Sequence, residues 1–489
     1  MDRNVFFRNG EVIRLASLKK EPVDEFRKGV LFAIRNGARI AAFFAKPGDR
    51  DGFELFLILA HDSEGGLSVH ACEVGDRYPA LTPDCPQAHL FEREIREQWG
   101  IVPEGHPWLK PVRFYPSPPG VCDFFKVEGE SVHEVAVGPV HAGIIEPGHF
   151  RFQCDGETVL HLEIALGFQH RGVERSLRGG PGKRTLHTME TLAGDTTIGH
   201  AAAYCQMIEA LSWCEAPVPA QAFRAIALEL ERLANHTGDL GALAGDIGYL
   251  PTSSYCGRIR GDFLNMTALF CGNRFGRGWL CPGGVAFDGD KPRRGSLSEK
   301  LETALKDVRS AVELLWQTPS VLARMEEIGT LSKESCEALG LVGPAARACG
   351  VSRDVRFDFP SGIYRFSQIP VSVGAKGDVF SRAYVRWLEI QRSVEFIREQ
   401  IENFPEGAVR KPCGALVPDA MACTLTEGWR GEICHVAMTD SRGLFCQYKI
   451  TDPSFHNWMG LALAMRDQQI SDFPLCNKSF NLSYCGHDL

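Results

Sequence analysis

The middle and later parts of this chain contain four long stretches in which apolar residues return at three- and four-residue steps. This spacing places apolar residues on one side of an α-helix, and each stretch is longer than an average globular helix. The chain has 489 residues, more than the roughly 250–300 at which a single core stops growing. The pattern therefore predicts a large, mainly helical domain beside at least one other domain. The stretches are residues 200–214, 219–248, 297–328 and 377–404.

The first part of the chain has a different pattern. "ARIAAFFAK" and "FELFLILAH" are typical of strands, and "QAHLFEREIREQWGI" has the spacing of an amphipathic helix. "RFYPSPPGVCDFF" is proline-rich and aperiodic, as linkers are. β-like runs follow it, and others precede the end of the chain. We expect an α+β domain over residues 1–112, a linker over 113–132, and a large mainly α-helical domain with small β-sheets over 133–489.

The charge balance excludes one class of function. The chain carries 53 basic and 61 acidic residues, a formal net charge of −8, whereas nucleic-acid-binding proteins carry a basic excess. No apolar run approaches the roughly 18 residues that cross a bilayer. The N-terminal "MDRNVFFRNGEVIRLASLKK" has no apolar stretch of the signal-peptide type. We expect no nucleic-acid partner, no export and a location in the cytoplasm.

The chain contains seventeen cysteines, and they are widely dispersed. Zinc and iron–sulfur sites usually take pairs two to four residues apart, because one turn must aim both thiolates at one ion. The closest pairs here, such as Cys205 and Cys214, are nine residues apart. Most of these thiols are therefore interpreted as small buried apolar side chains. Cys485, His487 and Asp488 lie close together at the end of the sequence and are residue types that bind metals. No second cysteine lies near them.

Several long blocks carry a resemblance to known families. "FEREIREQWGIVPEGHPWL" resembles the signature of the 30 kDa subunit of respiratory complex I. "GPVHAGIIEPGHFRF", "LGFQHRGVERSL", "GPAARACGVSRDVR" and "EGWRGEICHVAMTDSRGLFCQYKITDPSFHNW" resemble the 49 kDa subunit, which forms one family with the large subunit of group 4 membrane-bound [NiFe]-hydrogenases. A fused chain of this kind is similar to the large subunit of formate hydrogenlyase and hydrogenase-4. The resemblance implies the fold of that large subunit.

The same resemblance implies a nickel–iron site, but the ligand residues differ here. In [NiFe]-hydrogenases two Cys-x-x-Cys pairs supply four thiolates, and soft sulfur suits a redox-active nickel. The pairs correspond to positions in "AGDTTIGHAAAY" and "SFNLSYCGHDL", where Cys485 is one position out of register. All four thiolates are missing, so we expect no nickel–iron centre and no metal ligands. The four positions hold Ala193, Thr196, Ser483 and Gly486.

Similarity to complex I implies a quinone site instead. Complex I has a tyrosine in the loop that corresponds to the first cysteine pair, and its phenol can hydrogen-bond and protonate a quinone oxygen. That position is Gly194 here, with Asp195 beside it, and the nearest tyrosine, Tyr204, has the spacing of a core residue. The electron acceptor therefore stays open between a quinone and another molecule.

Polar residues near these positions make up the predicted site. Glu146 matches the glutamate that moves protons at the nickel site of hydrogenases, a task for which burial must raise a carboxyl pKa toward neutrality. The alternative is a glutamate that caps a turn before Pro147. His149 is either a proton carrier or a structural hydrogen-bonding residue, and His200 either lines the cavity or bonds a backbone carbonyl. The catalytic candidates are Glu146, His149, Asp195 and His200.

A second set of residues is expected around the same cavity. "QHRGVER" is expected to form an ion-paired turn, with Glu174, that faces a neighbouring subunit. The polar side chains expected to meet in this cavity offer hard oxygen or nitrogen donors. A metal ion such as Mg, Zn or Fe is therefore a less favoured alternative occupant of the cavity. The candidate cofactor-binding residues are His170, Arg171, Thr196, Ser483, His487 and Asp488.

The resemblance implies a peripheral-arm subunit of a membrane-bound oxidoreductase of the hydrogenase-4 or NADH-quinone oxidoreductase type, on the cytoplasmic side. Its implied partners are a small [4Fe–4S] subunit similar to the 20 kDa subunit of complex I, a ferredoxin-like subunit and antiporter-like membrane subunits. Electrons would pass from the partner's cluster to a quinone or unknown acceptor. Two alternatives remain: a non-catalytic structural subunit that couples redox chemistry to ion translocation, and an active [NiFe]-hydrogenase.

Overall fold

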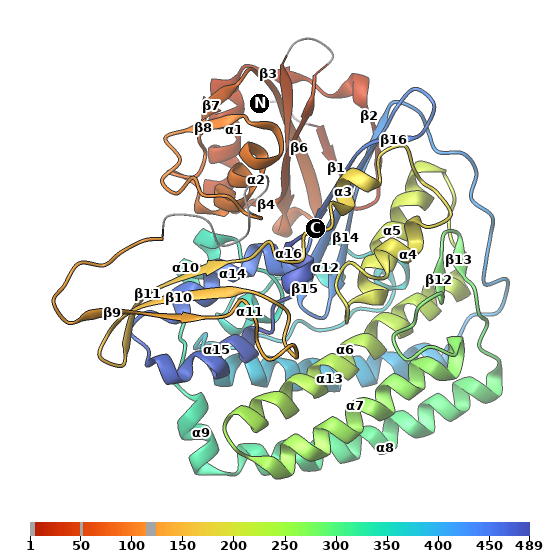
Figure 1. Ribbon diagram of the computed structural model, residues 1–489. Helices are drawn as coiled ribbons and strands as arrows, with labels where there is room; N and C mark the ends of the chain where they lie inside the picture. The colour runs from red at the N-terminus through yellow and green to blue at the C-terminus, as the bar shows by residue number, and fades with distance from the viewer. Residues whose placement is uncertain (1–4, 49–51, 114–123) are drawn as a thin grey trace.

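The computed structural model describes residues 5–48, 52–113 and 124–489 (Figure 1). The middle of the predicted linker, residues 114–123, lies outside the described residues. The N-terminal part is a sheet with strand order β1-β6-β5-β4, on which β3 pairs with β6. Its elements are β1 (Val5–Phe7), β3 (Lys20–Glu21), α1 (Val23–Arg35), β4 (Arg39–Pro47), β5 (Phe53–His61), β6 (Gly66–Val74), β7 (Arg77–Pro79), α2 (His89–Trp99) and β8 (Val102–Glu104).

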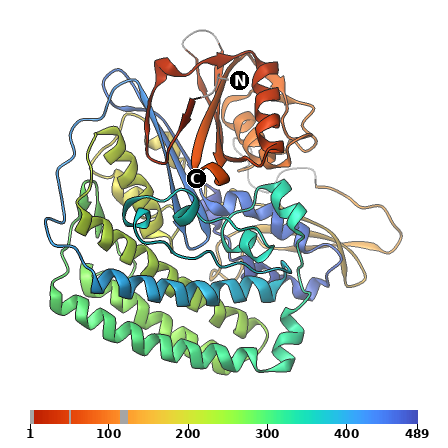
Figure 2. The ribbon, with the colours of Figure 1, turned by 180° about the vertical axis from the view of Figure 1, so that it is seen from behind.

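The described residues of the large part combine three small sheets, β11-β10-β9, β12-β13 and β16-β15-β14, with a layer of long helices (Figures 1 and 2). Helices α6, α7, α8 and α13 lie side by side at the bottom of Figure 1, and α6 contacts both α7 and α13. The long elements are β9 (Val132–Val137), β10 (His149–Asp155), β11 (Thr158–Ala165), α5 (Thr197–Leu211), α6 (Val218–Asp246), α7 (Leu250–Cys271), α8 (Lys291–Trp316), α13 (Val379–Glu402), β14 (Ala420–Gly428), β15 (Gly431–Thr439), β16 (Phe445–Thr451) and α14 (Pro453–Ala464).

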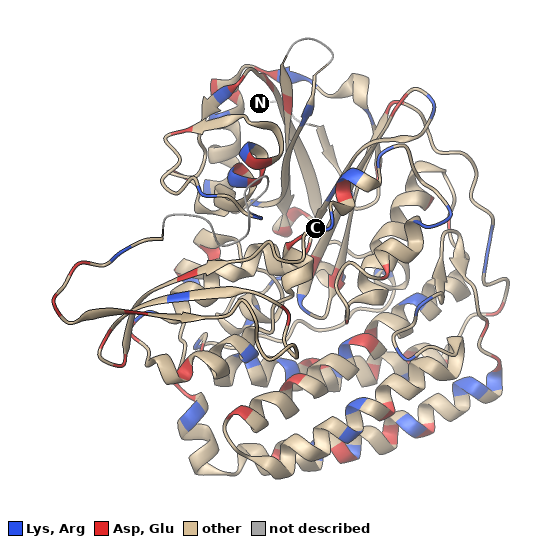
Figure 3. Cartoon of the chain, in the orientation of Figure 1, with Lys and Arg blue, Asp and Glu red and all other residues tan. Residues whose placement is uncertain are grey.

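Shorter elements connect these layers. They are α3 (Val173–Ser176), α4 (Thr185–Met189), β12 (Leu280–Cys281), β13 (Gly284–Val285), α9 (Pro319–Met325), α10 (Lys333–Leu339), α11 (Gly343–Ala348), α12 (Val355–Asp358), α15 (Phe473–Phe480) and α16 (Tyr484–His487). Basic and acidic residues both occur along the outer helices α7 and α8 (Figure 3). No helix of the described ranges is long and apolar enough to cross a bilayer.

The four predicted helices are present, with one correction. The stretch predicted as one helix over residues 297–328 is broken, because α8 ends at Trp316 and α9 begins at Pro319. Proline has no amide hydrogen to continue the helical ladder, and its ring disfavours helical backbone in the residue before it. The other three stretches form α5, α6 and α13 within a few residues of the predicted ends.

The N-terminal part is joined to the large part by a strand pairing. Strand β2 (Val12–Arg14) pairs antiparallel with β14, so that Val12 faces Ala422 across the ladder. A shared core of apolar side chains runs under both sheets and includes Phe44 and Met421. The boundary predicted at residue 112 therefore separates two segments that share a sheet and a core. This arrangement fixes β14 and β15, which carry part of the site described next.

Candidate functional site

The site forms where three segments that are distant in the sequence meet: the β9–β10 loop, the loop before α5, and α16. The loop over residues 193–196 leads into α5, and Glu231 of α6 accepts hydrogen bonds from the first amides of that helix, Ile198 N at 2.6 Å and Gly199 N at 3.1 Å. Ser483 caps α16 by accepting a hydrogen bond from Gly486 N at 2.9 Å. Both caps hold the ends of their helices in place, because the first amides of a helix have no partner within it.

Glu146 reaches from the β9–β10 loop to α16. Its Oε2 accepts a hydrogen bond from Tyr484 N at 3.2 Å. The Cys485 thiol lies between this carboxylate and the Gly194 backbone, and both hydrogen-bond to it. Burial and the Glu146 charge raise the pKa of Cys485 to about 12, so the thiol stays protonated and can donate to the carboxylate. Cys485 thus connects the two segments that carry metal ligands in the resembled hydrogenases.

Asp195 is paired with an arginine that the sequence interpretation missed. Arg430 donates to Asp195 Oδ1 at 2.5 Å and Oδ2 at 2.9 Å, and to Thr196 Oγ1 at 3.2 Å. Its guanidinium is buried and lies 3.9 Å from the centre of the Trp429 ring. Burial alone would lower the pKa of Arg430, but Asp195 keeps it raised. In the sequence this arginine lies in the "EGWRGE" block. The structure shows that the residues on either side of it are buried.

The backbone around Asp195 is also fixed. Trp429 Nε1 and Asn235 Nδ2 both donate to the Asp195 carbonyl oxygen at 3.0 Å. Arg171 donates to the carbonyl oxygens of Thr191 and Leu192, each at 2.9 Å. The loop before α5 is therefore held from both sides. Arg171 contacts that loop rather than Glu146.

The last residues of the chain are held by the "QHRG" turn. Asp488 accepts hydrogen bonds from Gly167 N at 2.9 Å and Gln169 N at 3.0 Å, and its own backbone oxygen lies 3.2 Å from His170 Nδ1. His487 Nδ1 lies 2.8 Å from Asp488 Oδ1. Asp488 is buried, and both of its carboxylate oxygens are in use. Its observed role is to fasten the end of the chain.

The other predicted residues lie around the site in separate settings. His149 Nδ1 lies 3.3 Å from the Gly138 carbonyl oxygen. Arg151 pairs with Glu134 at 2.6 Å, so it does not neutralise Glu146. Glu174 accepts from Lys449 at 3.0 Å and from Ile450 N at 2.9 Å. His200 points into the core, where its ring contacts Asp452 and His435.

The four positions that hold cysteines in the resembled hydrogenases are filled by other contacts. Thr196 Oγ1 accepts from Arg430, Ser483 Oγ accepts from Gly486 N, and Ala193 is buried. A Cβ atom at Gly486 would lie 2.6 Å from Asp452 Cγ, closer than real Cβ contacts. Within the described part of the chain, no group of three or more His, Cys, Asp or Glu side chains is arranged to hold a metal ion. The donor set does not fit a nickel–iron centre.

The described part of the chain also has two larger open cavities. One of about 840 Å³ is bordered by Arg113, His170, Arg171, Arg175 and Arg178. Another, of about 300 Å³, lies between α5, α6 and residues 361–365 and is lined by Glu427 and Arg356. Neither is lined by Glu146, Thr196 or Ser483.

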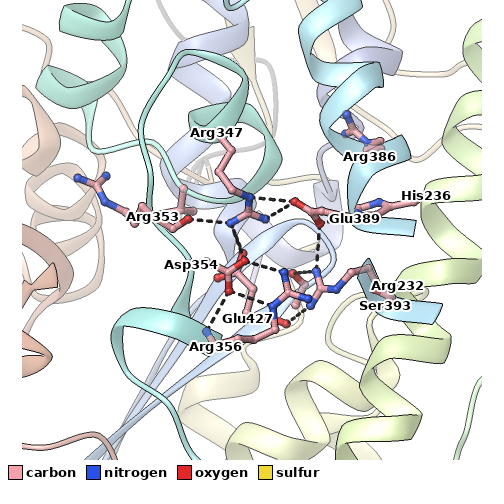
Figure 4. Close-up of polar contacts among 12 residues, drawn as sticks. Arg232, His236, Arg347, Arg353, Asp354, Arg356, Arg386, Glu389, Ser393 and Glu427 are labelled. Carbon is pink, nitrogen blue, oxygen red and sulfur yellow. Dashed lines mark hydrogen bonds and ion pairs between the residues drawn. The ribbon is translucent and has the colours of Figure 1, made fainter. Parts of the chain in front are cut away.

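A buried ionic network supports the turn that carries Arg430 (Figure 4). Arg347 contacts Glu389 at 2.9 Å and Glu427 at 2.8 Å, and Arg356 contacts Asp354 at 2.6 Å. His236 Nε2 lies 2.8 Å from Glu389. Burial and the neighbouring Asp354 raise the pKa of Glu427 to about 7. The network joins α6, α11, α12 and α13 to the end of β14, two residues before Trp429.

Comparisons with known proteins agree with this architecture. Residues 31–118 match the family of the 30 kDa subunit of respiratory-chain NADH dehydrogenase, and residues 246–415 match that of the 49 kDa subunit. A carbon monoxide-induced hydrogenase of Rhodospirillum rubrum is 31% identical over 72% of this chain and 98% of its own length. Formate hydrogenlyase subunit 5 of Escherichia coli is 28% identical over 83% and 76%, respectively. A subunit of an NADH-quinone oxidoreductase of Solibacter usitatus is 28% identical over 69% and 91%.

Proposed function

This chain belongs to the family of group 4 hydrogenase large subunits and complex I 49 kDa subunits, fused to a 30 kDa-type domain, and from this premise we propose its role in an oxidoreductase complex. The role is that of a peripheral-arm subunit, on the cytoplasmic side of the membrane, in a complex of the hydrogenase-4 or NADH-quinone oxidoreductase type. Electrons arrive from an adjacent [4Fe–4S] subunit, and a ferredoxin-like subunit and antiporter-like membrane subunits complete the assembly. The electrons reduce a quinone or another small acceptor near Glu146.

The chain works without nickel in this proposal. The four ligand positions carry hydroxyl, methyl or hydrogen side chains in place of thiols. Asp452 fills the space that a side chain at Gly486 would need. Hard oxygen donors do not stabilise a redox-active nickel. Elemental analysis of the intact complex should therefore find no stoichiometric nickel. One nickel per chain together with hydrogen uptake would overturn this part of the proposal.

One observation carries the proposal of a working site: Glu146 reaches α16, one of the two segments that replace the metal-binding motifs, and Cys485 connects this contact to the other segment at Gly194. Its carboxylate accepts from Tyr484 N and from the Cys485 thiol, with no cation of the described residues paired to it. A carboxylate without a paired cation can take up and release a proton, whereas a salt bridge would hold it ionised. The Cys485 thiol supplies the hydrogen of this contact, and the Glu146 carboxylate accepts it.

A second candidate is a structural subunit whose site is inactive. It is favoured by the oxygen atoms of Asp488, Thr196 and Ser483, which are engaged in contacts within the chain. The purified complex separates the two candidates when it is assayed with NADH, formate or reduced ferredoxin and titrated with a quinone analogue. Analogue binding that is lost in Glu146→Gln supports the working site. The structural role is supported if the complex turns over fully, does not bind the analogue, and keeps its turnover in the Glu146→Gln variant.

A further inference from the structure

The larger of the two open cavities lies where the N-terminal part of the chain meets the large part. It has a volume of about 840 Å³, and its lining comes from the end of α2, from Arg113, and from α3 and β16 of the large part. Ligand sites are often clefts of about 300–1,000 Å³ between domains, so this cavity has the place and size of such a site. Glu146 does not line it, and the cavity is therefore separate from the proposed redox site.

This cavity has an excess of positive charge, although the chain as a whole carries a net charge of −8. Four arginines line it, against Glu97, Glu174 and the carboxylate of the last residue, Leu489. Both glutamates are already engaged, because Glu174 pairs with Lys449 at 3.0 Å and Glu97 accepts a hydrogen bond from Arg113 N at 2.9 Å. A cleft lined by charges of one sign concentrates ions of the other sign. The four arginines are Arg113, Arg171, Arg175 and Arg178.

Arg113 is the buried member of this set. It is 4% exposed, and its Nη2 lies 2.7 Å from Glu94 Oε1 and 3.2 Å from the His487 carbonyl oxygen. Its Nε and Nη1 atoms are also buried, and neither has a hydrogen-bond acceptor among the described residues. Burial alone would lower the pKa of Arg113, but Glu94 and Glu97 keep it raised, so the guanidinium stays charged. Because buried donors are normally paired, two unused nitrogens on a guanidinium that lines a cavity favour an acceptor that enters from outside.

Trp99 adds a further unused donor to the lining. Its indole Nε1 is buried and has no acceptor within the described part of the chain. The Arg178 guanidinium lies 5.1 Å from the centre of the Trp99 ring and donates to Gln447 Oε1 at 3.0 Å, so this side of the cavity is held in place. The unused buried groups that line the cavity are N–H donors, which favours an anion as the occupant over a cation.

The other three arginines are exposed and reach the cavity from the solvent side. Arg171 donates to the carbonyl oxygens of Thr191 and Leu192, whereas the Arg175 side chain has no hydrogen bond or ion pair with a described residue. An occupant can therefore meet Arg113 from inside and Arg175 from outside. Phosphate and carboxylate groups present several acceptor oxygens, which suits contact with more than one guanidinium.

We propose that this cavity binds an oxyanion, a phosphate or carboxylate group, between Arg113 and the three exposed arginines. The contact is noncovalent, and it joins groups of the N-terminal part to groups of the large part, so an occupant should raise the melting temperature of the protein. The oxyanion has two sources, a soluble ligand or an acidic side chain of a neighbouring subunit, which the tests separate. The site does not depend on the proposed redox function.

The first test is calorimetric titration of the purified full-length chain with inorganic phosphate, pyrophosphate and citrate at constant ionic strength. Saturable binding of one pyrophosphate or citrate per chain is expected, together with a higher melting temperature. Arg175→Gln should weaken binding roughly tenfold, the scale of one charge-assisted hydrogen bond. Trp99→Phe keeps an aromatic ring, removes the unused donor, and should weaken binding by a smaller factor. Arg309→Gln is the matched control, because this exposed arginine of α8 lies outside the cavity and its loss changes the charge equally.

Arg113→Gln should abolish saturable binding in the same titration. Circular dichroism checks its folding, since the variant also removes an ion-pair partner of Glu94. If the variant does not fold, Arg175→Gln decides the question, because no ion pair with a described residue is lost there. Equal, unsaturated signals from the unchanged chain, Arg175→Gln and Arg309→Gln would mean an adventitious ion only and would overturn the site.

The second test repeats the titration with the intact complex and identifies the source of the oxyanion. A soluble ligand is the source if the complex binds pyrophosphate or citrate as tightly as the isolated chain does. An acidic side chain of a neighbouring subunit is the source if the complex does not bind them and Arg175→Gln weakens assembly. No saturable binding in either sample, with normal assembly of Arg175→Gln, overturns the proposal. None of these measurements uses turnover, so failure of the proposed redox function would not change their outcome.

Discussion

The Asp195 carboxylate and the Arg430 guanidinium meet in a two-pronged contact, with N–O distances of 2.5 and 2.9 Å. The contact lies in the loop where the resembled hydrogenases place their first pair of thiolates. It joins α5 to the turn between β14 and β15, 235 positions away in the sequence. The ion pair thus fastens the loop that is matched to the first thiolate pair to the β14–β15 turn.

Removal of one partner of this contact should destabilise the protein. Arg430→Gln leaves the Asp195 charge partly buried, which we expect to cost roughly 2–4 kcal/mol, less than a fully buried pair because Asp195 is about a third exposed. The double variant with Asp195→Asn should lose less than the sum of the two single variants. Thermal melting of the complex measures each difference. Arg442→Gln, which breaks an exposed contact with Asp440, is the control and should change little; strictly additive losses would contradict the coupling.

Glu146→Gln should lower turnover of the complex by roughly 10²-fold, the usual scale for the loss of a general acid–base group. Glutamine keeps the shape and can still accept from Tyr484 N, so assembly and melting temperature should stay constant. The control is Glu134→Gln. Glu134 lies on the adjacent strand β9, and its carboxylate pairs with Arg151. Equal rates for both variants would favour the structural role, and loss of assembly would show that Glu146 is a structural residue.

Gly486→Ala should destabilise the protein by roughly 1–3 kcal/mol, because the new methyl group overlaps the Asp452 carboxylate. Gly194→Ala is the matched control from the other half of the site, since a Cβ there meets nothing within 4 Å. Differential scanning calorimetry of the two variants tests the difference. Similar melting temperatures would mean that Asp452 moves freely, and a side chain at position 486 would then be tolerated.

Stability should fall in acid because of buried neutral histidines, of which His456 is an example. Burial, with the nearby Arg39 and Arg353, lowers the pKa of His456 to about 3, well below the ordinary value of an unfolded chain. Between about pH 6.5 and 3 the unfolded chain binds the extra proton, so stability is present above this window and is lost as the pH falls through it. The slope is about 1.4 kcal/mol per pH unit for one proton.

His456→Gln should reduce that slope by about one proton's worth in denaturation experiments at about pH 4–5.5, where the unfolded histidine is almost fully protonated and the folded one is not. His187, whose side chain is 72% exposed, supplies the control, and His187→Gln should leave the slope as it is. An unchanged slope for His456→Gln would mean that His456 titrates normally in the folded protein.

Local patterns in the sequence predicted the helices, and the limits of those patterns explain the errors. Apolar spacing located α5, α6 and α13, because each buries one continuous face. The same spacing continues past Pro319, so the apolar pattern did not reveal that α8 ends at Trp316. The break comes from the backbone constraints of proline. Apolar runs also located β4 and β5 of the N-terminal sheet.

The site was less predictable because its contacts are distant in the sequence. Glu146 was singled out by resemblance, but its contact with Cys485 depends on how α16 folds back. The Asp488 carboxylate is a side chain of the kind that binds metal ions. In the structure its two oxygens instead accept hydrogen bonds from the backbone amides of Gly167 and Gln169, which the sequence does not reveal. The two partners of His200, His435 on β15 and Asp452 at the start of α14, lie on other elements, and no spacing in the sequence connects them.

The pairing of β2 with β14 also sets an order of events during synthesis. Arg14 and its partner across this ladder, Ala420, are 406 positions apart. At roughly 5–20 residues per second, β2 leaves the ribosome on the order of tens of seconds before its partner strand exists. During that time the edge of β2 and the apolar face shared with Met421 lack their cover. The N-terminal part of the protein therefore reaches its final structure late, only after the strands of the large part have been made.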